Sequence, residues 1–205
     1  MKKTFVSNSQ ESSRMFKSDF LEAFSKVHFT VPLYIFIPVI VYFTWRAFAV
    51  ANNTILVFLA SFIAGIFFWT LTEYVLHRFV FHFVPKSQWG QRLHFIFHGV
   101  HHDYPNDRLR LVMPPSVSIP LATAFYLLFV WLIPAEYVYG FFAAFITGYL
   151  IYDISHYAMH HFTFKNPIMK KIKQHHMQHH YAEPDRGYGV SSALWDKIFR
   201  SDFEK

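Results

Sequence analysis

Histidines recur in this sequence at short, repeated intervals that suit metal binding. The chain contains 14 histidines, and 13 of them lie after residue 76. Four clusters carry the pattern: His77 and His82; His98, His101 and His102; His156 and His160; and His176, His179 and His180. Imidazole nitrogens bind iron, zinc, copper and nickel. Because the chain has no cysteine, thiolate ligands are excluded, and a metal here would have nitrogen and oxygen ligands.

The spacing within the clusters indicates how many metal ions they bind. Residues three and four positions apart lie on one face of an α-helix, so each His-x2-His-His triplet directs two or three imidazoles to one point. His77 and His82 are five apart, which requires a reach around the helix edge or a local distortion of the helix. Ten imidazoles exceed the coordination of one ion, and the pattern therefore predicts two metal ions.

The remaining histidines and the nearby acidic residues are expected to have other roles. Four histidines fall outside the repeated spacing and are not predicted ligands: His28, His94, His161 and His175. Because neutral imidazoles leave the charge of two divalent ions uncompensated, acidic residues are expected close to the ligands. The candidates are Glu73, Asp103, Asp107, Asp153 and Asp185. Asp153 is preferred because it precedes His156 by three residues.

The elements that must position these histidines are predicted to be membrane helices. Hydrophobic residues make up 53% of the chain and charged residues 16%, whereas soluble domains contain about 25% charged residues. Uncharged apolar runs predict spans at about 30–50, 54–72, 117–133 and 137–153, each near the length that crosses a bilayer. Turn signals at Asn52-Asn53 and at Pro134-Ala135-Glu136 join them into two hairpins. A soluble protein would need a polar face on these helices, and they have none.

Basic residues indicate how the spans are oriented. Eighteen of the 19 lysines and arginines lie before residue 30, between residues 72 and 116, or after residue 153. With four spans these three segments share one side of the membrane, and an excess of basic residues marks the cytoplasmic side. No dense basic stripe occurs, so the net charge of +6 is interpreted as membrane topology and contact with anionic lipid, and nucleic acid is not an expected partner.

The predicted fold is therefore an all-α integral membrane protein with four transmembrane helices in two hairpins. Residues 1–29 form a cytoplasmic N-terminal segment, in which the apolar spacing from Met15 to Phe29 predicts an interfacial amphipathic helix. Residues 30–205 form a single domain. A helical cytoplasmic cap, residues 73–116 and 154–205, holds the histidine-rich site for two metals.

Several strings around the histidines resemble a known family. They are EYVLHRFVFH (73–82), LHFIFHGVHH (93–102), RLVMPP (110–115), GYLIYD (148–153), HHMQHH (175–180), GYGVSS (187–192) and LWD (194–196). The histidine clusters resemble the membrane fatty acid hydroxylase and sterol desaturase superfamily. The strings between them are similar to fatty acid 2-hydroxylases, which act on the acyl chains of sphingolipids. The resemblance covers about residues 30 to 200.

This resemblance implies an activity and its cofactors. It implies an oxidoreductase of lipid biosynthesis, a non-haem diiron monooxygenase that hydroxylates carbon 2 of the fatty acyl group of ceramide or another sphingolipid. It implies two metal ions, iron in the active enzyme with zinc possible after purification, and dioxygen as co-substrate. The implied ligands are the ten clustered histidines. The His-Pro-Gly-Gly haem motif of an N-terminal cytochrome b5 domain is absent from the sequence, so a separate donor of cytochrome b5 or ferredoxin type is expected.

Two alternatives remain open at this point. The first is another lipid enzyme of the same superfamily, such as a sterol or carotenoid hydroxylase or a desaturase. The second is a membrane metal-binding or transport protein. It is disfavoured because transporters place ionisable groups near the bilayer midplane, and these spans are nearly free of them. For location, the bacterial inner membrane is preferred to the endoplasmic reticulum.

Overall fold

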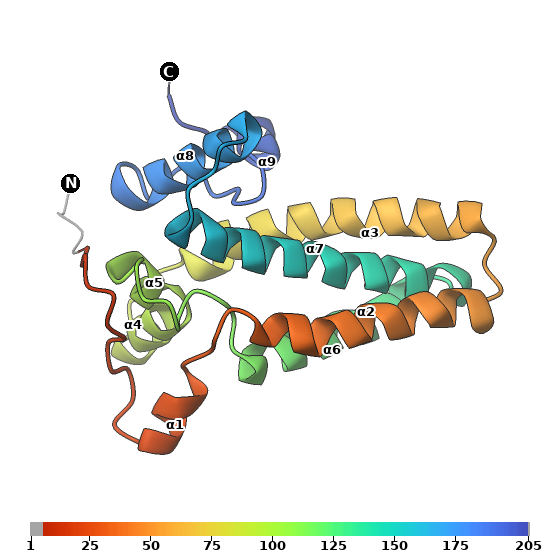
Figure 1. Ribbon diagram of the computed structural model, residues 1–205, viewed down its shortest axis with the longest axis horizontal. Coiled ribbons are helices and arrows are strands. Elements are labelled where there is room, and N and C mark those ends of the chain that lie inside the picture. The colour runs from red at the N-terminus through yellow and green to blue at the C-terminus, as the bar shows by residue number, and fades with distance from the viewer. Residues whose placement is uncertain (1–5, 205) are drawn as a thin grey trace.

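A computed structural model of the chain describes residues 6–204, and every regular element in that range is helical. Four helices are long and apolar enough to cross a membrane: α2 (Val31–Ala49), α3 (Ile55–Val75), α6 (Pro115–Leu132) and α7 (Ala135–His161). They form two hairpins that lie side by side (Figure 1). The predicted all-α membrane fold is confirmed, and the chain is an integral membrane protein.

Both hairpin turns form where the sequence predicts them. Asn52 adopts a positive φ of 52°, a conformation that asparagine tolerates better than most residues. Thr54 then caps α3 by accepting a hydrogen bond from the amide of Val57. In the second hairpin Pro134 is the N-cap of α7, directly after α6 ends. Short connections therefore keep consecutive spans antiparallel.

Helix α7 is the central element of the bundle. It packs against α2, α3 and α6, and it is the most buried of the four spans. Glycines permit its close approach to α3: a Cβ atom on Gly65 would lie 2.3 Å from the carbonyl oxygen of Phe141, and one on Gly148 would lie 2.6 Å from Trp69. Small residues of this kind let membrane helices approach each other closely. Helices α3 and α7 are thereby held together along the membrane bundle.

Shorter helices form a cap at one end of the bundle (Figure 1). They are the π-helix η1 (Leu76–Phe81), α4 (Gln88–His94), the π-helix η2 (Phe95–Gly99), α5 (Val100–Asp103), α8 (Pro167–Tyr181) and α9 (Leu194–Ile198). The N-terminal segment and the C-terminal helices lie at this same end, as the basic residues predict. Both α3, through η1, and α7 continue past the predicted ends of their spans at residues 72 and 153, and so carry histidines into the cap.

The N-terminal helix is shorter than predicted. The apolar spacing predicts a helix from Met15 to Phe29, but α1 covers only Asp19–Phe24. Other hydrogen bonds compete for the backbone amides on either side of it. The amides of Met15 and Phe16 donate to the Glu22 carboxylate, and the amide of Val27 donates to the carbonyl of Leu109. Part of the segment, residues 1–5, lies outside the described residues.

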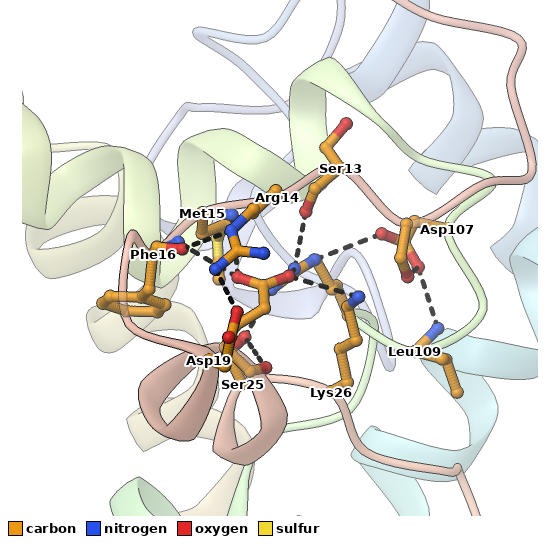
Figure 2. A network of polar contacts seen from close by, with 12 residues as sticks. Ser13, Arg14, Met15, Phe16, Asp19, Ser25, Lys26, Asp107 and Leu109 are labelled. Atoms are coloured by element: carbon orange, nitrogen blue, oxygen red, sulfur yellow. Dashed lines mark hydrogen bonds and ion pairs between the residues drawn. The ribbon is translucent and has the colours of Figure 1, made fainter.

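A buried ion pair fastens this N-terminal segment to the cap. Arg110 lies 2.5 Å from the Glu22 carboxylate and donates to the carbonyl of Ser13 and the hydroxyl of Ser25. Asp107 approaches the same guanidinium at 3.3 Å. Figure 2 shows Ser13, Ser25 and Asp107 converging on this point from separate segments. Because the pair is buried, loss of one partner would leave an uncompensated charge.

We expect this contact to weaken in acid. Burial alone would raise the pKa of Glu22, but its hydrogen bonds and the charges of Lys26 and Arg110 lower that pKa from 4.5 to about 2. A lowered carboxyl pKa stabilises the folded state above about pH 4.5, and this contribution is lost as the pH falls to about 2. Hydrogen exchange, corrected for intrinsic rate, should therefore rise over residues 7–27 in that interval.

The Glu22→Gln variant should exchange rapidly over residues 7–27 already at pH 7, with no further acid transition there. A destabilisation of about 3 kcal/mol is typical when one partner of a buried pair is removed. The matched control is Asp19→Asn, which removes an exposed carboxylate from the same short helix. Protection of the Glu22→Gln variant equal to that of the parent would contradict the assigned role.

Candidate metal centre

The π-helix η1 explains the five-residue spacing of the first histidine pair. In a π-helix the hydrogen bond closes five residues back, and the amide of His82 donates to the carbonyl of His77 at 3.1 Å. The two side chains therefore lie on one side of the helix, with their Nε2 atoms 3.3 Å apart. The local distortion that the spacing required is present. A second π-helix, η2, carries His98 to the start of α5.

All ten predicted ligands meet in the cap, in two groups of five. The His77 group consists of His77, His82, His98, His102 and His179, and the His101 group consists of His101, His156, His160, His176 and His180. Within each group one nitrogen from every residue lies within 4.8 Å of all the others. Four histidines outside the repeated spacing belong to neither group: His28, His94, His161 and His175.

Each triplet divides between the two groups, which differs from the expectation that it aims at one point. His98 and His102 join one group while His101 joins the other, and His176 and His180 separate in the same way from His179. Residues four apart share a helix face, whereas the residue next to one of them is rotated by about 100°. Each triplet can thus supply two ligands to one centre and one ligand to its neighbour.

Nitrogen atoms face one another at short distances within both groups. In the His77 group, Nε2 of His98 lies 3.1 Å from that of His77 and 2.9 Å from that of His102. In the His101 group, Nε2 of His156 lies 2.9 Å from that of His101. Nδ1 of His77 donates to the carbonyl of Tyr188, so its Nε2 presents a lone pair. Converging lone pairs of this kind are stabilised by a cation between them.

Burial keeps these imidazoles neutral near pH 7. It lowers the pKa of His82 to about 3 and that of His179 to about 4. Burial also lowers the pKa of five further cap histidines well below the ordinary value: His98, His101, His102, His176 and His180. Metal ions bind the neutral form of imidazole. The groups therefore present their lone pairs without competition from protons.

Several buried nitrogens of the His101 group have no hydrogen-bond partner in the described part of the chain. They are Nδ1 of His101, His156, His176 and His180, and Nε2 of His180. A buried polar group without a partner is destabilising, and a metal ion would give the Nε2 atom its partner. The donor set, its convergence and its neutrality therefore fit two metal ions. All-imidazole donors suit iron, zinc, copper or nickel.

The acidic candidates lie around the histidines in different ways. Asp153 is fully buried and accepts hydrogen bonds from the amide of Met113 and the hydroxyl of Tyr149, each at 3.2 Å. Its placement close behind the ligands stays a prediction. Sequence reasoning missed Asp196, which is buried beneath the loop that contacts the His77 group. The sequence signal at Asp196 is the LWD string (194–196), which belongs to the family resemblance.

An apolar cavity in the membrane bundle approaches both groups through aromatic side chains. It is lined by residues of α3, α6 and α7, which include Trp69, Leu121, Ala122, Phe125, Phe145 and Ile146. At its cap end Phe81 stacks on His98 with ring centres 5.4 Å apart, and Tyr152 stacks on His156 at 5.7 Å. The cavity thus meets one histidine of each group through an aromatic side chain.

Comparison with known proteins decides the family. Residues 62–201 match the family model described as fatty acid hydroxylase. The chain belongs to the fatty acid hydroxylase family. This confirms the predicted family and its oxidoreductase class, and it disfavours the metal transporter.

Three relatives illustrate the similarity. A dihydroceramide fatty acyl 2-hydroxylase of Arabidopsis thaliana is 38% identical over 93% of this chain and 80% of the relative. A ceramide very long chain fatty acid hydroxylase of Saccharomyces cerevisiae is 41% identical over 88% of this chain and 47% of the relative. A fatty acid 2-hydroxylase of Mus musculus is 39% identical over 92% of this chain and 56% of the relative. The chain therefore spans about half the length of the yeast and mouse proteins.

A solved structure shares the fold of this hydroxylase chain. It is that of full-length scs7p, in which only the hydroxylase domain is visible. The two structures superpose with a TM-score of 0.86 at 39% sequence identity, over 91% of this chain and 70% of the other. The four-span bundle with its cap is thus a fold of this family.

Proposed function

We propose that this hydroxylase is a dimetal membrane monooxygenase that hydroxylates carbon 2 of the fatty acyl group of ceramide, using dioxygen and external electrons. The observation that carries the proposal is the position of two neutral five-histidine groups against an apolar cavity in the bundle. The names of the relatives, which are fatty acyl or fatty acid 2-hydroxylases, support the same substrate and the same carbon.

The ten clustered histidines are the proposed ligands, five for each metal. Iron is the proposed metal, and zinc would suit the same nitrogen donors. When bound, the metal pair supplies the activation of dioxygen that cleavage of an unactivated C–H bond requires, because side-chain acids and bases cannot supply it. The protein holds the ligands in a buried cap and keeps bulk water away from them.

The chain's own residues determine which carbon is presented. An acyl chain in the cavity between α3, α6 and α7 would have its carbonyl end near Phe81 and Tyr152. These are the two aromatic side chains that stack on histidines. The polar head of the lipid would remain at the membrane surface, where water is available. A carbon next to the carbonyl lies at this boundary, so fixed positioning favours carbon 2 over carbons deeper in the tail.

The cap is proposed to face the cytoplasm, because the basic residues gather on its side of the bundle. The bacterial inner membrane stays a prediction, which fractionation of the source cells would test. A separate electron donor of cytochrome b5 or ferredoxin type is proposed as the redox partner. The lysines near the start of α8 are assigned to anionic lipid headgroups. Lys165, Lys170 and Lys171 are exposed, and Lys173 is partly buried.

The experiment is lipid mass spectrometry of a sphingolipid-producing host that lacks its own 2-hydroxylase, with and without this chain and a working electron donor. The proposal predicts ceramides whose acyl chain has gained one oxygen at carbon 2. Acyl chains that have lost two hydrogens would instead identify a desaturase, and oxygenated sterols or carotenoids would identify a different substrate. Either of these outcomes would contradict the proposal.

Narrowing the cavity should change which acyl chains are accepted. Ala122 lines it on α6, and we expect Ala122→Phe to lower turnover of long acyl chains by about 10-fold or more, because one or two lost methylene contacts already cost 1–3 kcal/mol. Shorter chains should be less affected, and bound metal unchanged. The matched control is Ala124→Phe, because Ala124 lies on the same helix and is exposed. Equal loss for all chain lengths would argue against acyl binding there.

A further inference from the structure

A carboxylate from the C-terminal helix holds the loop that follows α8. Asp196 is fully buried, and its two oxygens accept hydrogen bonds from the amides of Tyr188 at 2.8 Å and Gly189 at 2.7 Å. Its Oδ1 atom also accepts from the hydroxyl of Ser201 at 2.9 Å. A Cβ atom at position 189 would lie only 2.1 Å from the carbonyl oxygen of Ser192 and 2.8 Å from Asp196. Glycine is therefore required for the carboxylate to approach this closely.

A second carboxylate, from α3, holds the next two residues of the same loop. Glu73 accepts hydrogen bonds from the amides of Val190 and Ser191, both at 2.8 Å, and from the Ser191 hydroxyl at 2.5 Å. Four consecutive backbone amides, 188 to 191, are thus bound by two buried carboxylates. Hydrogen bonds to four successive backbone amides therefore hold this loop in place.

Two carbonyl groups of this loop accept hydrogen bonds from histidines of one group. The carbonyl of Tyr188 accepts a hydrogen bond from Nδ1 of His77 at 2.5 Å, and the carbonyl of Arg186 accepts one from Nδ1 of His179 at 2.7 Å. Both histidines belong to the His77 group. Within the described residues, Nδ1 of four members of the His101 group has no partner. The two groups therefore differ in whether a backbone carbonyl holds the Nδ1 side of the imidazole rings.

We propose that Asp196 and Glu73 are positioning residues that preorganise the His77 group through this loop, so that its metal is bound more tightly than the metal of the His101 group. The inference rests on the proposed function, because it takes the histidines to be metal ligands. A carbonyl on the far nitrogen fixes the tautomer and the orientation of a ligating imidazole, and loss of such partners typically weakens metal binding by about 10- to 100-fold. The carboxylates act one step further away, by holding the carbonyls in place.

The test uses the full-length protein in detergent with Zn²⁺ as the metal. Zinc bound per chain is counted after dialysis against graded concentrations of a chelator. The parent should bind two zinc ions and release them in two separate steps. The Asp196→Asn variant keeps the shape of the side chain but loses one acceptor oxygen. Its affinity for the more tightly bound zinc ion should fall by about 10- to 100-fold. The chelator concentration that releases the more weakly bound zinc ion should not change.

Two backgrounds assign the affected step to a histidine group. His160→Ala removes a ligand of the His101 group, and the Asp196→Asn shift should persist in it. His82→Ala removes a ligand of the His77 group, and the shift should disappear. The matched control is Asp107→Asn, an equally buried cap carboxylate that contacts the N-terminal segment and should leave both steps unchanged. If Asp196→Asn does not fold, Ser201→Ala removes one contact and should give a smaller shift of the same step.

Equal weakening of both steps, no weakening, or a shift that persists in the His82→Ala background would overturn the inference. So would a parent protein that binds fewer than two zinc ions. Because the readout is bound zinc, a failure to form 2-hydroxy lipid would contradict the proposed function without affecting this result.

Discussion

The His101→Ala variant is expected to lose formation of 2-hydroxy lipid by more than about 100-fold. His101 is buried in its group, with Nε2 2.9 Å from Nε2 of His156. Substitution of a residue that hydrogen-bonds to a metal ligand already lowers metal affinity or activity by about 10- to 100-fold. Removal of a ligand itself should lower them further. The measurements are lipid mass spectrometry in cells lacking other hydroxylases and a metal count on the purified protein, which should fall from two to one.

The matched control for His101→Ala is His161→Ala. His161 directly follows His160 in the sequence but belongs to neither group, and its ring contacts Tyr157. Its substitution should leave both metal content and product unchanged. Retained product in the His101→Ala variant would remove His101 from the ligand set. Equal losses in both variants would indicate a general defect of the cap.

Removal of the metals is expected to loosen the cap while the membrane bundle stays folded. A ligand present at 1,000 times its Kd stabilises the folded state by about 4 kcal/mol, so two tightly bound ions should contribute about twice that. Without them, neutral nitrogens converge at 2.9 Å in both groups, and several are buried without partners. Hydrogen exchange measured after chelation should therefore rise in α5 and α8, because both helices carry ligands to the two groups.

The spans provide the internal control for metal removal. Helices α2 and α6 carry no ligand and should exchange as slowly after chelation as before. Returning the metal should restore protection in α5 and α8. Unchanged exchange throughout the cap after complete metal removal would show that the histidine groups are stable without a cation, contrary to the interpretation of their lone pairs.

The spans and the histidine set were predictable because both depend on local sequence. Apolar runs of sufficient length indicate membrane helices wherever they occur, and the structure has helices at all four positions. The ten histidines were selected by type and spacing, and all ten gather in the cap. The spacing of His77 and His82 even indicated a helix distortion, although it did not distinguish a π-helix from a reach around the helix edge.

Features that depend on contacts between distant residues could not be predicted in this way. The division of each triplet between two groups also depends on which histidines of other helices lie nearby, and spacing along one helix does not contain that information. The predicted helix from Met15 to Phe29 was too long because Leu109 competes for the backbone amide of Val27. Asp196 was missed because its effect on His77 passes through the backbone of Tyr188.

The most direct test of the account is a single turnover of the purified, iron-loaded protein with ceramide, a chemical reductant and labelled dioxygen. One labelled oxygen is expected at carbon 2 of the acyl chain, and the yield should fall to background in the His101→Ala variant. A product with unlabelled oxygen, or with oxygen at another carbon, would contradict the claim that these two histidine groups carry out an oxygen-dependent acyl 2-hydroxylation.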